Sequence, residues 1–215
     1  MQTFTSGNTA IRLRQSEPAS ATPRPAILLL HGAGGNVDQW FDRLAPPLAA
    51  AGIALYAPHY FDRTATAFAD TATILDGEHV PLWLETVRDT LTYISERPAA
   101  DPSRIALLGI SLGAFISLAL GTEAAQPIKA IVELSGGLVS PWDARVTPNF
   151  PPTLILHGEA DKVVPVAEAH KVDRILTEHQ VPHQTQLFAA EDHWFSTAAQ
   201  IRIVTLVSDF LAAYL

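Results

Sequence analysis

Short apolar runs that alternate with amphipathic segments are the feature that most constrains the fold of this chain. Runs that are apolar at successive positions are typical of strands buried on both faces of a parallel sheet. Strands that alternate with helices indicate βαβ units and a mostly parallel sheet covered by helices. The chain is therefore predicted to have an α/β fold. The six runs, of which the last is more alternating, span residues 26–30, 53–57, 105–108, 130–134, 153–156 and 184–188.

Helical spacing of apolar residues appears in segments that follow some of these runs. Pro98 closes the first segment and Gly121 follows the second, and both residue types are common at helix ends. Residues 17–25 contain three prolines and are predicted to form a loop between a short N-terminal hairpin and the first core strand. The predicted helical segments span about 83–94, 112–120, 166–176 and 201–211.

Composition limits the domain organisation and the possible chemistry. With 215 residues, of which 48% are hydrophobic, we expect one domain over residues 1–215, with no room for a separate cap domain. The chain has no cysteine, which excludes a disulfide framework, a cysteine-ligated metal site and a thiol nucleophile. The net charge of −8 argues against a nucleic-acid partner, because phosphate binding needs a basic surface.

The N-terminal residues and the apolar runs bear on location. Residues 1–15 contain no apolar run typical of a secretory signal. The longest aliphatic run, 26–30, is far shorter than the ~20 residues that span a bilayer. We therefore expect a cytoplasmic protein without a membrane partner.

A G-x-S-x-G motif lies where a strand is predicted to end and a helix to begin. In open α/β sheets ligands bind beyond the carboxyl ends of the strands. The sequence Gly109-Ile110-Ser111-Leu112-Gly113 follows the third apolar run directly. Strand, sharp turn and helix is the context of a nucleophile elbow, which makes Ser111 a candidate nucleophile. The alternative is a glycine-rich turn in which the serine only caps the helix.

A serine nucleophile needs a base, and in this context the acid and the histidine follow it in that order. Asp161 lies 50 residues after Ser111, directly beyond the run 153–156, and His193 lies 32 residues further on. We predict that Asp161 orients His193 and that His193 is the general base. Asp161 could instead cap the helix that begins near Val166, and a lone histidine is often structural. The other histidines considered are less suitable, because they fall in or beside a helix, end a strand, or come too early: His170, His179, His183, His157 and His79.

A glycine-rich loop follows the first core strand, with the sequence His31-Gly32-Ala33-Gly34-Gly35. Acyl transfer develops an oxyanion, which two backbone N–H groups can hold. We predict that Leu112 supplies one and Ala33 the other, with Gly34 as the alternative to Ala33. A phosphate-binding loop is disfavoured, because the loop lacks both the G-x-x-x-x-G-K-[ST] and the G-x-G-x-x-G spacing.

The segments LLLHGAGG, GISLG, LHGEADKVVP and EDHWF together resemble the α/β-hydrolase family from Ile27 to Leu215. Within that family the chain is most similar to the dienelactone hydrolase-like branch and to small carboxylesterases. The resemblance implies an α/β-hydrolase fold with an eight-stranded, mostly parallel sheet and a triad of Ser111, Asp161 and His193. True dienelactone hydrolases use a cysteine nucleophile, whereas this chain has Ser111, which favours a serine esterase. Small acyl-thioesterases share nearly the same motifs.

Aromatic residues in two long connections and beside the proposed base are candidates for a substrate pocket. We name Tyr60, Trp142 and Trp194, which could line an acyl or alcohol pocket. The alternative is that these rings only cover the sheet.

The sequence thus predicts a serine hydrolase that cleaves small carboxylic esters through an acyl-enzyme, with no metal and no organic cofactor. Its partner would be a small-molecule ester, and the oligomeric state is left open. Alternatives are an acyl-thioesterase or a lactone hydrolase on the same triad, a serine acyltransferase or perhydrolase, and a non-catalytic binding module of this fold.

Overall fold

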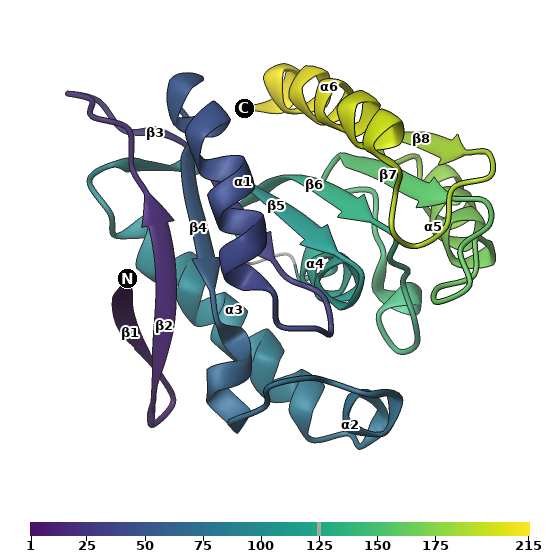
Figure 1. The fold of residues 1–215 in the computed structure, drawn as a ribbon, viewed down its shortest axis with the longest axis horizontal. Coiled ribbons are helices and arrows are strands. Elements are labelled where there is room, and N and C mark those ends of the chain that lie inside the picture. Colours follow the sequence, from purple (N-terminus) through teal and green to yellow (C-terminus); the bar gives the residue numbers. More distant parts are fainter. Residues whose placement is uncertain (124–125) are drawn as a thin grey trace. The chain divides into compact units, whose positions relative to one another are not determined.

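A computed structural model describes residues 1–123 and 126–215 and places them in two compact units, Met1–Ile105 and Ala106–Leu215. Strand β5 (Ala100–Ile110) begins in the first unit and ends in the second. Both units combine strands with helices (Figure 1).

The first unit contains an antiparallel hairpin that leads into parallel strands. Its strand order is β1-β2-β4-β3. The β1–β2 and β2–β4 pairs are antiparallel, and the β3–β4 pair is parallel. Gly7, with φ +52°, makes the turn of the predicted hairpin. The elements are β1 (Gln2–Ser6), β2 (Thr9–Ser16), β3 (Arg24–Leu30), α1 (Val37–Ala50), β4 (Ala54–Pro58), the 3₁₀ helix η1 (Tyr60–Thr64), α2 (Thr71–Leu75) and α3 (His79–Ser95).

Apolar patterning explains the core of this unit. All five residues of the run 26–30 are buried in β3, as a strand with two covered faces requires. Helix α3 buries the stripe predicted for it, which includes Trp83, Val87, Leu91 and Ile94. This buried stripe shows that α3 is a helix that packs on the core of the first unit.

Helix α1 was not predicted from the sequence. It contains two adjacent prolines, Pro46 and Pro47, and buries only Val37 and Phe41. Prolines inside a helix remove backbone hydrogen bonds, so the local pattern argued against a helix. Contacts with another element support it instead, because Arg14 of β2 forms ion pairs with Asp38 and Asp42 of α1.

The second unit is built from parallel strands and long helices. Its strand order is β5-β6-β7-β8, and the β6–β7 and β7–β8 pairs are parallel. Helix α4 packs on β6, α5 on β7 and β8, and α6 on β6 and β7. The elements are α4 (Leu112–Gly121), β6 (Ile128–Leu134), the 3₁₀ helix η2 (Asp143–Arg145), β7 (Thr153–Gly158), α5 (Ala167–Glu178), β8 (His183–Phe188) and α6 (Thr197–Tyr214).

Gly121 differs from the cap predicted for it. It is the last residue of α4, and the C-cap is Thr122 in a right-handed conformation with φ −78°. Close packing accounts for the glycine, because a Cβ at this position would lie 2.7 Å from both Ile131 and Phe150. The residue therefore lets α4 approach its neighbours within the second unit.

The six strands and four helices predicted from apolar patterning are all present, although β5 begins five residues before its predicted run and α3 and α6 each begin four residues before their predicted segments. The described residues form eight strands, most of whose pairs are parallel, and show no separate cap domain. The predicted α/β class is thus confirmed, whereas the single domain over residues 1–215 stays a prediction. No helix in residues 1–123 and 126–215 is both long and apolar enough to cross a membrane.

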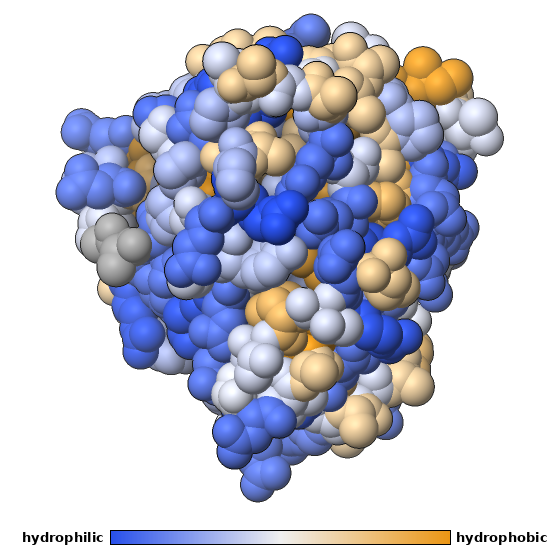
Figure 2. Space-filling model, turned by 90° about the vertical axis from the view of Figure 1, so that its left-hand side faces the viewer, coloured by the Kyte–Doolittle hydropathy of each residue, from blue (hydrophilic) through white to orange (hydrophobic). Residues whose placement is uncertain are grey.

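Strand β1 lies at the edge of its sheet and presents polar side chains. Gln2, Thr3 and Thr5 are exposed along it. The face on the side of β1 and β2 is largely hydrophilic, with small scattered apolar patches (Figure 2). Polar side chains on an edge strand discourage pairing with further strands.

Candidate active site

Ser111 lies in a strained turn between β5 and α4. Its backbone has φ +53° and ψ −119°, a conformation that a residue with a Cβ rarely adopts. Three backbone hydrogen bonds hold it: its amide donates to Leu134 O at 2.8 Å, and its carbonyl accepts from Ala114 and Phe115. The turn is therefore hydrogen-bonded both to β6 and to the first turn of α4.

The glycine that precedes Ser111 by two positions is required by close packing. A Cβ on Gly109 would lie 2.6 Å from Ala114 Cα and 2.5 Å from Ser117 Oγ, and it would also meet Gly113 O. Strand β5 and helix α4 could not approach each other in this way with a larger residue. This close packing explains the first glycine of the G-x-S-x-G motif.

The carboxylate of Asp161 lies in the turn after β7 and is oriented by backbone amides. Its side chain has no exposed surface. Oδ1 accepts hydrogen bonds from the amides of Val163 and Val164, both at 2.8 Å. The side chain does not cap α5, whose N-cap Val166 has no side-chain cap bond. Because Oδ1 is held by these amides, Oδ2 is left to face another group.

That other group is His193, in the loop between β8 and α6. His193 Nδ1 lies 2.7 Å from Asp161 Oδ2, and His193 Nε2 lies 3.1 Å from Ser111 Oγ. A carboxylate only accepts hydrogen bonds, so Nδ1 carries the proton and donates it to Asp161. In the neutral imidazole Nε2 then accepts from the Ser111 hydroxyl. The structure thus brings the three predicted residues into one hydrogen-bonded chain within the second unit.

Asp192 and Glu191 form hydrogen bonds that link the turn carrying Asp161 to the loop carrying His193. Asp192 Oδ1 accepts from the amides of Lys162 and His193, and Lys162 Nζ lies 3.2 Å from Asp192 Oδ2. These bonds favour the charged carboxylate and lower the pKa of Asp192 to about 2, with the amide of His193 as the largest cause. The amide of Ala160 also donates to Glu191 O at 2.9 Å. Asp192 was not predicted from the sequence, although it directly precedes His193.

Gly158 allows the same two segments to meet. A Cβ on this residue would lie 2.8 Å from Asp192 O and would also contact Glu191 O. The last residue of β7 therefore packs directly against the backbone of the loop that carries His193. A larger residue would displace that loop.

A fully buried carboxyl group lies on β6, close to the turn that follows the strand. Glu133 Oε2 accepts from the amide of Gly136 at 2.8 Å, and Oε1 has no hydrogen-bond partner among the described residues. Burial raises the pKa of Glu133 from 4.5 to about 8, and the Gly136 bond opposes this only in part. Glu133 is therefore neutral near pH 7. The sequence pattern did not identify it, because it lies within an apolar run.

The two residues of the predicted oxyanion hole belong to different units. Leu112 is the first residue of α4, so its N–H is one of the helix amides that lack a partner within the helix. Ala33 and Gly34 lie in the loop after β3, in the first unit. Their part in an oxyanion hole stays a prediction.

The three aromatic candidates for a pocket differ in exposure. The structure does not support the prediction that Tyr60 lines a substrate pocket. Its ring is fully buried and stacks on His31 at 4.0 Å between centroids, and its hydroxyl donates to His31 O at 2.6 Å. It packs inside the first unit and has no accessible surface for a substrate. Trp142 is half-buried at the start of η2. Trp194 is 69% exposed and lies edge-on to His193 at 5.1 Å between centroids.

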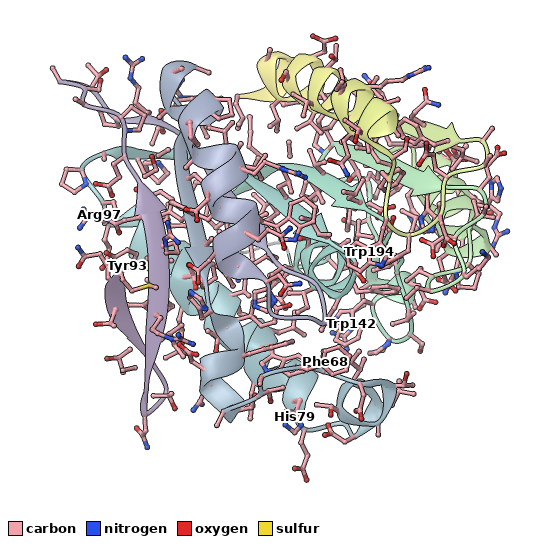
Figure 3. The ribbon with its side chains drawn as sticks, viewed as in Figure 1. Phe68, His79, Tyr93, Arg97, Trp142 and Trp194 are labelled. Carbon is pink, nitrogen blue, oxygen red and sulfur yellow. The ribbon has the colours of Figure 1, made fainter. Side chains whose placement is uncertain are left out.

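Figure 3 labels both tryptophans of the second unit, which come from the loops after β6 and β8. Trp194 lies against His193 of the hydrogen-bonded chain, and Trp142 directly precedes η2. Within the described parts of the chain, no group of three or more histidine, aspartate or glutamate side chains could hold a metal ion.

The fold and the order of the residues in the site define the class of this protein, which is the α/β hydrolases. A solved dienelactone hydrolase-like promiscuous phosphotriesterase from metagenomic libraries has the same fold, with a TM-score of 0.84 at 21% identity, over 99% of this chain and 96% of that one. Residues 11–208 match the Dienelactone hydrolase family, and the chain belongs to that family.

Two curated relatives have names that describe hydrolases. The putative esterase NocK of Nocardia uniformis subsp. tsuyamanensis is 30% identical over 160 residues, which cover 73% of this chain and 46% of NocK. A putative carboxymethylenebutenolidase of Synechocystis is 22% identical, over 84% of this chain and 79% of the relative. The chain spans less than half the length of NocK and of several other curated relatives.

Proposed function

We propose that this protein is a serine hydrolase that cleaves small carboxylic esters through Ser111, His193 and Asp161. Its family supports hydrolysis of an ester or lactone bond. The observation that carries the proposal is the chain of hydrogen bonds from Asp161 through His193 to Ser111, with distances of 2.7 Å and 3.1 Å. A binding protein has no need for three groups aligned in this way.

The proposed reaction begins with proton transfer from Ser111. His193 Nε2 takes the hydroxyl proton as Oγ attacks the carbonyl carbon of the ester, and Asp161 stabilises the imidazolium that forms. The imidazolium then donates this proton to the alcohol oxygen as the ester bond breaks. The alcohol departs, and the acyl group remains attached to Ser111 Oγ. A water molecule activated by His193 attacks the acyl carbon and releases the acid.

Two backbone N–H groups would hold the oxyanion formed at each attack. We assign them to Leu112, at the N-terminus of α4, and to Ala33, with Gly34 as the alternative. Removal of one such donor typically raises the barrier by ~3–4 kcal/mol. Trp142 and Trp194 remain candidates for contacts with the acyl or alcohol group, and no metal or cofactor takes part in these steps.

Lactone hydrolysis is the second candidate, because one relative is named a putative carboxymethylenebutenolidase, and a butenolide is a lactone. In a lactone the alcohol stays attached to the acyl group, so the same three residues would open the ring. Ester and lactone activity therefore differ in pocket shape and not in the catalytic groups.

Hydrolysis of p-nitrophenyl esters of two to twelve acyl carbons tests the proposal. We expect activity on the short chains and a fall of at least about 10³-fold in kcat for Ser111→Ala, with unchanged thermal unfolding. Labelling of the wild type, but not of the variant, by a fluorophosphonate is the matched control. Wild-type rates in Ser111→Ala would contradict the proposal, and absent labelling of the wild type would favour a binding module.

A further inference from the structure

His157 lies at the C-terminal end of β7, directly before the turn that carries Asp161. Its side chain has no exposed surface. Nε2 lies 2.9 Å from the carbonyl oxygen of Val164 and 3.4 Å from Asp161 Oδ2. A carbonyl oxygen only accepts hydrogen bonds, so Nε2 carries the proton and donates it to Val164.

Val164 connects this histidine to the carboxylate at both ends of its backbone. Its carbonyl accepts from His157, and its amide donates to Asp161 Oδ1 at 2.8 Å. The resulting closed ring runs from the imidazole through Val164 to the carboxylate and back to the imidazole. It fixes the turn, and thereby the direction in which Asp161 Oδ2 points.

We propose that His157 is a positioning residue that holds Asp161 toward His193 through this ring. The proposal rests on the proposed function for its kinetic consequence, because only then does the Asp161–His193 bond support catalysis. His157 touches neither Ser111 nor His193 in the contacts described, and its other nitrogen, Nδ1, is buried with no hydrogen-bond partner among the described residues. An unsatisfied buried nitrogen is costly, which is difficult to explain if the position only filled space.

A purely apolar residue would fill the same space without that cost. A leucine at position 157 would remove the donor to Val164 and leave its carbonyl unpaired in a buried site. The turn could then relax, and Asp161 Oδ2 would no longer be held at 2.7 Å from His193 Nδ1. A glutamine keeps an N–H donor at about the distance of Nε2, whereas an asparagine is too short to reach Val164.

The test compares His157→Leu, His157→Gln and His157→Asn with the wild type. We expect kcat for a short p-nitrophenyl ester to fall about 10–100-fold in the leucine and asparagine variants, with KM within about twofold, and to recover in the glutamine variant. The second readout is the proton NMR signal of His193 Nδ1–H, which a short bond to a carboxylate shifts downfield. It should move upfield in the first two variants and return in the third.

Leu176→Ala is the control, because Leu176 of α5 is fully buried in the same unit and its apolar side chain is not part of the hydrogen-bonded chain of the proposed catalytic residues. It should lower the melting temperature while leaving kcat and the NMR signal unchanged. If His157→Leu does not fold, the comparison of glutamine with asparagine decides. Equal kcat and equal signals in those two variants would overturn the proposal, as would a wild-type signal in His157→Leu.

The two proposals fail in different ways. If Ser111→Ala hydrolyses esters at the wild-type rate, the proposed function is wrong, yet the NMR signal still reports whether His157 positions Asp161. If Ser111→Ala is inactive and the His157 variants keep both kcat and the signal, only the role of His157 is wrong.

Discussion

Substitution of Glu133 by glutamine should change how the stability of the protein depends on pH. The carboxyl group is fully buried on β6, with a pKa raised from 4.5 to about 8 by burial. Glutamine has nearly the same shape, and its side-chain oxygen can accept the bond from Gly136, but it cannot titrate. The variant therefore removes one titratable group and leaves the side-chain volume nearly unchanged.

The size of the effect follows from the two pKa values. Between pH 4.5 and about 8 the folded protein keeps the proton of Glu133, whereas the unfolded chain releases it. The stabilisation from this proton is complete below pH 4.5 and is lost as the pH rises through the folded pKa. At about 1.4 kcal/mol per pH unit, this group removes at most about 5 kcal/mol of stability by pH 8.

Urea unfolding followed by tryptophan fluorescence at several pH values from 5 to 9 measures the effect. We expect the wild type to be the more stable protein at pH 5, because the glutamine amide buries two N–H donors where the protonated carboxyl buries one O–H, and an extra unpaired donor costs about 1–3 kcal/mol. With rising pH the difference should shrink by about 1.4 kcal/mol per pH unit and reverse sign between about pH 6 and pH 7. Glu178→Gln, at an exposed position in α5, should keep the wild-type pH dependence. A difference between wild type and Glu133→Gln that stays constant from pH 5 to 9 would refute the reasoning.

Two further predictions concern the loop that carries His193. In Gly158→Ala the added Cβ meets the backbone of Glu191 and Asp192. We therefore expect about 1–3 kcal/mol of destabilisation in urea unfolding and a fall of about tenfold or more in kcat/KM for ester hydrolysis. A wild-type kcat/KM would show that the loop tolerates the displacement. In Trp194→Ala we expect KM for aryl esters to rise up to about tenfold, because an aromatic contact contributes about 0.5–1.5 kcal/mol. Trp194→Phe should keep most of the affinity, and an unchanged KM in the alanine variant would remove Trp194 from the pocket.

Much of the fold could be predicted from local patterns, because burial on both faces of a strand or on one face of a helix leaves a periodic record in the sequence. The runs 26–30 and 153–156 are examples, and both are buried strands. Helix α1 was not predicted from such a periodic apolar pattern. Pro46 and Pro47 argue against it locally, and the contacts that support it, with β4 and with Arg14 of β2, come from other elements.

The candidate site divides in the same way. Ser111, Asp161 and His193 follow the ends of β5, β7 and β8, and this order predicted that they meet, because the carboxyl ends of parallel strands lie at one edge of a sheet. The role of aromatic residues could not be predicted so directly. Tyr60 and Trp194 both follow strands, yet one is fully buried and the other is 69% exposed, because His31 stacks on Tyr60 and fixes it in the core.

By itself, the sequence determined the succession of strands and helices and the glycine spacing around Ser111, since both depend on neighbours in the chain, and the order of residues after the strands predicted Asp161 and His193 as its partners. Only the tertiary structure decided that Asp192 accepts bonds from two loops, that His157 donates to Val164 in the turn of Asp161, and that Glu133 is fully buried. The physical reason is that hydrogen-bond partners and desolvation come from segments distant in the sequence, and no local pattern records which polar group they will enclose.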